Sequence, residues 1–200
     1  MANAILIHGF CKKKIYMLPG HPVMSENHWF PWLKTELCQR GILTANPELP
    51  RAWAPDYKSW KRELERHDIN EDTILIAHSY GCAFLIRWLG ETNKTVGKIV
   101  LVTPYMGIDL EKDLPPEVLA KYDFFKFDVD PNLAKKTRQG LTIFKSTDDF
   151  EKVNKSIDIL LDKWGDSVKL ITLKDRGHFQ TREKWIEFKF PELLEEVISE

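Results

Sequence analysis

Short apolar runs rich in β-branched residues alternate along the chain with segments whose apolar residues recur at helical spacing. Each apolar run ends in turn-forming residues such as glycine, proline, asparagine or aspartate. Because the runs are nearly continuously apolar, we expect parallel strands that are buried on both faces of a sheet. The pattern predicts six strands, at residues 4–7, 42–45, 73–76, 98–102, 141–145 and 168–173.

The amphipathic segments between these strands predict helices at residues 31–40, 56–67, 82–89, 151–164 and 182–198. Strands that alternate with helices favour an α/β fold, here a mostly parallel sheet with helices on both faces. In such folds the sites lie at the carboxyl ends of the strands. Since 200 residues without a repeat fit one core, we expect a single domain spanning residues 1–200.

Residues 104–140 do not fit this alternation, because they contain no convincing strand and carry several large aromatic side chains. A long segment of this kind is usually functional or folds into short helices of its own. Two interpretations stay open. The segment is either a small lid near the site or a helical excursion whose rings pack into the core.

A serine stands at a tight turn between a predicted buried strand and a predicted apolar helix, in the motif Ala77-His78-Ser79-Tyr80-Gly81. This is the pattern of a nucleophile elbow, G-x-S-x-G, with alanine at the first glycine position. Such a turn is strained and exposes the serine hydroxyl, while the following helix presents its positive end. The motif predicts Ser79 as a nucleophile. His78 is expected to point away from the site and to pack.

A nucleophilic serine needs a base, and the base needs a third group that orients it. In this fold the acid and then the histidine follow the serine along the chain. After the strand at 141–145 come Asp148 and Asp149, and after the strand at 168–173 come Asp175 and His178. The order predicts His178 as the base, and the three aspartates compete for the acid's role.

The oxyanion of an acyl-transfer intermediate requires two preorganised N–H donors. One is expected from the residue after the nucleophile, Tyr80, and the other from Phe10 in the loop after the first strand. Aromatic residues near these loops suggest a pocket for an apolar ligand. The residues expected to line it are His8, Gly9, Tyr105, Phe124, Phe125 and Phe179.

Composition excludes several other classes of function. A formal net charge of −1 gives no excess of positive charge of the kind that binds nucleic acid. Three cysteines without ligand spacing favour reduced thiols and a cytoplasmic protein, and no histidine set suggests a metal. The chain starts without the pattern of a signal peptide, and no apolar run approaches the ~20 residues of a membrane span. We therefore expect no cofactor, no metal and no membrane association.

Five motifs together resemble the small α/β-hydrolases related to retinoblastoma-binding protein, the YdeN-like serine hydrolases. They lie at residues 5–10, 29–37, 77–81, 146–149 and 177–180. The resemblance implies an α/β-hydrolase fold with a minimal cap. It also implies that the second aspartate of the pair is the acid, so that the triad is Ser79, Asp149 and His178. Three features depart from the family pattern: Ala77, Phe150 where proline is common, and a longer loop at 11–28.

The sequence thus predicts a serine hydrolase that cleaves small esters or related acyl compounds through an acyl-enzyme. Acyl transfer or peptide hydrolysis by the same triad is an alternative. A second alternative is a catalytically idle module that binds a protein partner, although the sequence identifies no such partner.

Overall fold

The computed structural model describes residues 2–11, 24–110, 122–180 and 189–199. At its centre is a six-stranded sheet with the strand order β2-β1-β3-β4-β5-β6, and every neighbouring pair is parallel. The sheet confirms the mostly parallel α/β architecture expected from the sequence. Its strands are β1 (Asn3–Ile7), β2 (Leu43–Ala45), β3 (Ile74–His78), β4 (Lys98–Val102), β5 (Leu141–Ser146) and β6 (Val168–Leu173).

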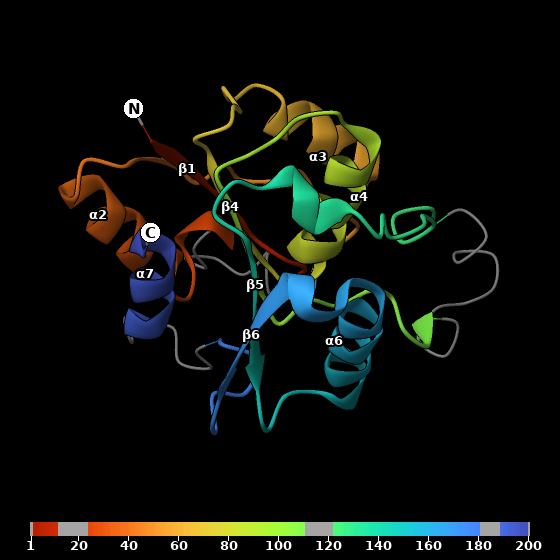
Figure 1. Cartoon of the computed structure of the whole chain (residues 1–200). Helices are drawn as coiled ribbons and strands as arrows, with labels where there is room; N and C mark the ends of the chain where they lie inside the picture. Colours follow the sequence, from red (N-terminus) through yellow and green to blue (C-terminus); the bar gives the residue numbers. More distant parts are fainter. Residues whose placement is uncertain (1, 12–23, 111–121, 181–188, 200) are drawn as a thin grey trace.

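Helices cover both faces of this sheet. Helices α2 and α7 lie on one face, and α3, α4 and α6 lie on the other (Figure 1). Successive side chains of a strand point to opposite faces of the sheet. Leu6 of β1 packs in the core on the side of α2 and α7, and Ile7 packs in the core on the side of α3, α4 and α6. The helices are α2 (Phe30–Gln39), α3 (Tyr57–Leu64), α4 (Tyr80–Glu91), α6 (Glu151–Trp164) and α7 (Pro191–Ile198).

Strand β6 is the most exposed part of the sheet. It lies at the edge, where β5 is its only neighbour among the described strands. Lys169, Leu170 and Thr172 are exposed to solvent. By contrast, β3 and β4 in the middle of the sheet are buried throughout. The edge strand nevertheless leads directly into the loop that carries His178.

The last helix differs from the one expected at 182–198, because it begins at Pro191. Proline has no N–H and fixes φ, so it suits the first position of a helix and disfavours helical backbone in the residue before it. Phe190 accordingly has φ −129° and ψ 71°. Residues 181–188 of the expected helix lie outside the described residues.

In the segment 104–140, the described residues include one short 3₁₀ helix, η3 (Leu133–Lys136). Phe124 is fully buried, and its ring packs edge-on against Trp60 at a centroid distance of 5.1 Å. Arg87 of α4 donates to the carbonyl of Asp123 at 2.8 Å. This part of the segment therefore packs into the core. Residues 111–121 of the segment lie outside the described residues, and the lid hypothesis for residues 104–140 stays a prediction.

Candidate active site

Ser79 occupies the sharp turn between β3 and α4. Its backbone has φ 53° and ψ −120°, a conformation that is costly for a residue with a side chain. Neighbouring backbone holds it there: the Ser79 N–H donates to the carbonyl of Val102 at 3.0 Å, and the Cys82 N–H donates to the carbonyl of Ser79 at 3.0 Å. The strained turn directs the serine side chain to the carboxyl edge of the sheet, as a nucleophile elbow requires.

Two glycines allow the elbow to approach the first strand. A Cβ at Gly81 would lie 2.5 Å from the carbonyl oxygen of His8, so α4 could not pack this close to β1 with any other residue. A Cβ at Gly9 would lie 2.9 Å from the Cβ of Ser79 and 3.4 Å from the backbone N of Tyr80. The loop after β1 therefore lies directly against the serine and the start of α4.

A chain of hydrogen bonds joins the three residues that the sequence singled out. The Oγ of Ser79 lies 2.9 Å from Nε2 of His178. Nδ1 of His178 lies 2.9 Å from Oδ1 and 3.1 Å from Oδ2 of Asp149, whose side chain is fully buried. Since a carboxylate can only accept, Nδ1 carries a proton and donates to Asp149. In the neutral ring Nε2 is then the acceptor for the hydroxyl of Ser79.

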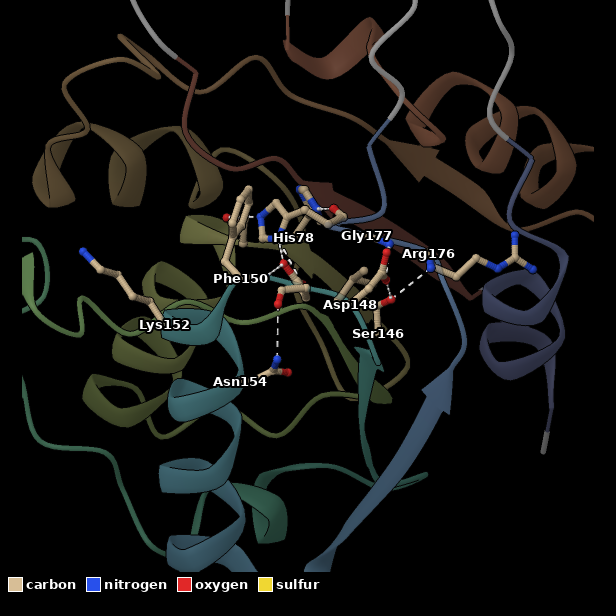
Figure 2. A network of polar contacts seen from close by, with 12 residues as sticks. His78, Ser146, Asp148, Phe150, Lys152, Asn154, Arg176 and Gly177 are labelled. Carbon is tan, nitrogen blue, oxygen red and sulfur yellow. Dashed lines mark hydrogen bonds and ion pairs between the residues drawn. The ribbon is translucent and has the colours of Figure 1, made fainter.

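The other two aspartates that competed for this role do not contact the histidine ring. Oδ1 of Asp148 accepts hydrogen bonds from the Ser146 hydroxyl at 2.6 Å and from the Gly177 N–H at 2.8 Å (Figure 2). These two donors hold the pKa of Asp148 below its usual value. Asp175 is exposed, and its N–H donates to the Thr147 hydroxyl at 3.2 Å. Of the three aspartates, Asp149 is thus the one that contacts the ring of His178, and it is also the one that the family resemblance implies.

His78 is buried among aromatic rings, as expected, but it does not point away from the site, because its ring lies 5.0 Å from the ring of His178. Its Nε2 lies 2.9 Å from the carbonyl oxygen of His178, so Nε2 carries a proton and donates. Trp29 and Phe30 pack edge-on against the ring at centroid distances of 6.0 and 6.2 Å. Burial, and secondly the proximity of His178, lower the pKa of His78 well below its usual value, so the ring is neutral.

An aromatic cluster adjoins the serine. The ring of Tyr80 stacks on Phe10 and on Tyr105, each at a centroid distance of 5.0 Å. Phe125 packs edge-on against Tyr80 at the same distance. We call these four residues the aromatic wall. Phe10, Tyr80 and Phe125 keep part of their surface exposed, while Tyr105 is buried.

Three residues expected to line the pocket are part of the interior instead. His8 is fully buried, and its Nε2 accepts from the Leu49 N–H at 2.8 Å. Phe124 is buried, as described above, and Phe179 is buried in a stack on Phe190 with ring centroids 4.8 Å apart. The pocket assignment of His8, Phe124 and Phe179 is therefore corrected. A hydrogen bond to the backbone holds His8 in the interior, and contacts with other aromatic rings hold Phe124 and Phe179 there.

Phe150 is a residue near the site to which the sequence analysis gave no role. Its ring lies 5.4 Å from the ring of His178, and 65% of its surface is exposed. The signal that could have found it is its departure from the proline common in the family at this position. Its backbone carbonyl accepts hydrogen bonds from the N–H groups of Val153 and Asn154, which fixes the backbone of Phe150 to the start of α6.

Within the described ranges, no group of three histidine, cysteine, aspartate or glutamate side chains is placed to hold a metal ion. A search of the same residues finds no helix long and apolar enough to span a membrane.

A serine, a histidine and a buried carboxylate joined in this order, at the carboxyl edge of a parallel α/β sheet, define the α/β-hydrolase class. Residues 15–194 match the model of the family described as serine hydrolase. The chain therefore belongs to the serine hydrolase family.

The chain is similar to the protein YdeN of Bacillus subtilis (strain 168), with 35% identity over 97 residues. That alignment covers 46% of this chain and about half, 51%, of the relative. The crystal structure of the ydeN product superposes with a TM-score of 0.75 at 23% identity, covering 98% of this chain and 96% of that one.

Two further solved structures share the fold at lower identity. Est1E from Butyrivibrio proteoclasticus has a TM-score of 0.68 at 14% identity, covering 98% of this chain and 85% of its own. The methylesterase MES16 from Arabidopsis has a TM-score of 0.59 at 16% identity, covering 91% of this chain and 94% of its own. At these identities the likenesses show a common fold.

Proposed function

We propose that this serine hydrolase cleaves small esters through an acyl-enzyme, with Ser79 as nucleophile, His178 as general base and acid, and Asp149 as the orienting carboxylate. The observation that carries the proposal is the continuous hydrogen-bond chain from the Ser79 hydroxyl through both nitrogens of His178 to Asp149. A serine hydroxyl is a weak nucleophile until such a base removes its proton.

In the first half-reaction, Oγ of Ser79 attacks the ester carbonyl carbon while its proton moves to Nε2 of His178. The tetrahedral intermediate collapses when Nε2 returns that proton to the departing alkoxide, which leaves as the alcohol. The acyl group then remains on Oγ. In the second half-reaction a water replaces the alcohol: it attacks the acyl carbon while Nε2 of His178 takes one of its protons. The bond between the acyl carbon and Oγ then breaks as Nε2 gives that proton to Oγ, which releases the carboxylic acid and restores Ser79.

The oxyanion is proposed to form between the N–H groups of Phe10 and Tyr80. The close approach of Gly9 to Ser79 supports this assignment, because it brings the loop after β1 against the first turn of α4. The positive end of that twelve-residue helix favours the same charge. Removing one donor of an oxyanion hole typically costs about 3 kcal/mol in transition-state stabilisation.

The acyl group is proposed to contact the aromatic wall, since Tyr80 follows the nucleophile directly and stacks on Phe10 and Tyr105. These rings favour short or medium apolar acyl groups over charged ones, by about 0.8 kcal/mol per methylene that they bury. The substrate is accordingly a small molecule. The cytoplasmic location expected from the sequence stays a prediction.

A fluorophosphonate probe and a chromogenic short-chain ester test the proposal, because only an activated serine reacts with the probe. We expect Ser79→Ala to abolish labelling, and both Ser79→Ala and His178→Ala to lower ester turnover on the order of 10⁴-fold. Asp149→Asn, which favours the wrong tautomer of the ring, should cost a similar factor. Ser167→Ala is the matched control, because Ser167 is exposed. It directly precedes β6 and so lies at the amino end of that strand, whereas the triad lies at the carboxyl ends of the strands. A folded Ser79→Ala protein that kept about a tenth of the wild-type rate would contradict the assignment, given the loss expected for a triad serine.

A further inference from the structure

The loop at residues 146–149, which we call the acid loop, holds the loop at 175–178, which we call the histidine loop. Each of the four consecutive side chains of the acid loop accepts a hydrogen bond from the histidine loop. The four bonds are Arg176 N–H to Ser146 Oγ at 3.0 Å, Asp175 N–H to Thr147 Oγ1 at 3.2 Å, Gly177 N–H to Asp148 Oδ1 at 2.8 Å, and His178 Nδ1–H to Asp149 at 2.9 Å.

Asp148 is the junction between the two loops. Its Oδ1 accepts from Gly177, the residue immediately before His178, and also from the hydroxyl of Ser146. Ser146 is fully buried at the end of β5, so it fixes the carboxylate to the sheet (Figure 2). A hydrogen bond to a charged carboxylate is stronger than one to a neutral acceptor. The backbone next to His178 is therefore tied to a rigid strand.

The backbone of the histidine loop needs such a restraint. Asp175, Gly177 and Phe179 have φ values of 54°, 54° and 50°, in the left-handed region that residues other than glycine rarely adopt. Strained backbone of this kind persists only where surrounding contacts determine it. On the other side of His178 along the chain, its carbonyl accepts a hydrogen bond from Nε2 of His78 at 2.9 Å. The peptide between Arg176 and Gly177 and the peptide between His178 and Phe179 are thus both anchored.

We propose that Asp148 is a positioning residue for the hydrolytic reaction, because its carboxylate fixes the backbone N–H of Gly177, the residue before His178, so that the ring meets Ser79 and Asp149 together. This inference rests on the proposed function of the triad. Asp148 itself does not touch the serine or the histidine ring. Without its carboxylate, the Gly177 N–H turns to water and the imidazole loses its fixed distance from the nucleophile.

Three variants test this role. Asp148→Ala removes the acceptor, and because the side chain is exposed it leaves no cavity. Asp148→Asn retains Oδ1, which received both bonds, so it is the conservative replacement. Asp162→Ala is the matched control, because it removes an exposed aspartate from α6, the helix that follows the acid loop. Fluorophosphonate titration counts the competent sites, and ester kinetics then give kcat per site and KM.

We expect Asp148→Ala to keep the wild-type number of titratable sites and KM, while kcat per site falls roughly 10- to 100-fold, as for a misplacement of about 1 Å. Asp148→Asn should regain most of that loss, and Asp162→Ala should match the wild type. Ser146→Ala, which removes the acceptor of the Arg176 N–H, should lower kcat in the same direction.

Either of two results for Asp148→Ala would overturn the proposal: an unchanged kcat per site, or a fall in titratable sites that accounts for the whole loss. An Asp148→Asn variant as impaired as Asp148→Ala would overturn it as well, since the retained oxygen would then have no effect. These failures differ from failure of the proposed function, in which the wild-type protein itself is not labelled at Ser79.

Discussion

Two buried histidines make the stability of this protein depend on pH below neutrality. Burial lowers the pKa of His78 well below the usual value of 6.5, and the nearby His178 lowers it further. Burial also lowers the pKa of His8, against an opposing effect of the Glu48 carboxylate 3.6 Å away. As the pH falls through 6.5, the unfolded chain therefore takes up protons that the folded chain does not, and the free energy of unfolding decreases.

The size of the effect follows from this difference in bound protons. Consider a histidine that stays neutral in the folded state and has its usual pKa in the unfolded chain. It lowers the free energy of unfolding by about 1.4 kcal/mol for each pH unit below that pKa. His78 alone should then lower the stability by about 1.4 kcal/mol between about pH 7.5 and about pH 5.5. His8 should add a smaller amount, because Glu48 opposes its shift.

Urea unfolding of the wild type and of His78→Asn at several pH values between about 5.5 and 7.5 measures the effect. The carboxylates with lowered pKa, those of Glu91, Asp130 and Asp148, titrate below this window and do not contribute. We expect the variant to be less stable at every pH but to show a clearly shallower pH dependence. The reasoning is refuted if the wild type is equally stable across the window, or if His78→Asn keeps the wild-type slope.

Two further predictions concern packing around the site. Gly81→Ala should destabilise the protein by roughly 1–3 kcal/mol and lower its melting temperature, because the added Cβ would lie 2.5 Å from the His8 carbonyl. Gly90→Ala in the same helix, whose Cβ would meet nothing closer than 3.8 Å, should be neutral or stabilising, and equal melting temperatures for the two variants would contradict this. Phe125→Ala should change the dependence of kcat/KM on acyl chain length, whereas Phe124→Ala should mainly lower stability by about 3–5 kcal/mol because that ring is buried. An unchanged chain-length profile for Phe125→Ala would remove it from the acyl site.

The sheet could be predicted from the sequence because its signals are local. The strands at 98–102 and 168–173 and the helix at 151–164 have the predicted bounds, since each is flanked by residues that end regular structure. The serine, aspartate and histidine could be found because parallel strands bring their carboxyl ends to one edge, so the chain order alone places them together.

The surroundings of the site could not be predicted, because side-chain direction in a loop depends on backbone angles that the sequence does not reveal. Phe179 was expected in the pocket. Its backbone has φ 50°, and its ring stacks on Phe190 in the core. The bond from His78 to the carbonyl of His178 joins residues 100 positions apart. Such a contact follows from the assembled fold rather than from any local pattern.

The position of β6 at the exposed edge of the sheet also has a consequence for the triad. Ser79 leaves a strand buried in the middle of the sheet, whereas His178 lies 99 residues further along and follows the strand with a single neighbour among those described. Regions with few buried contacts open at lower free energy than the centre of a structure. The hydrogen bond between Ser79 and His178 thus joins the centre of the sheet to the segment after its edge strand, and we expect that bond to depend on β6 staying paired with β5.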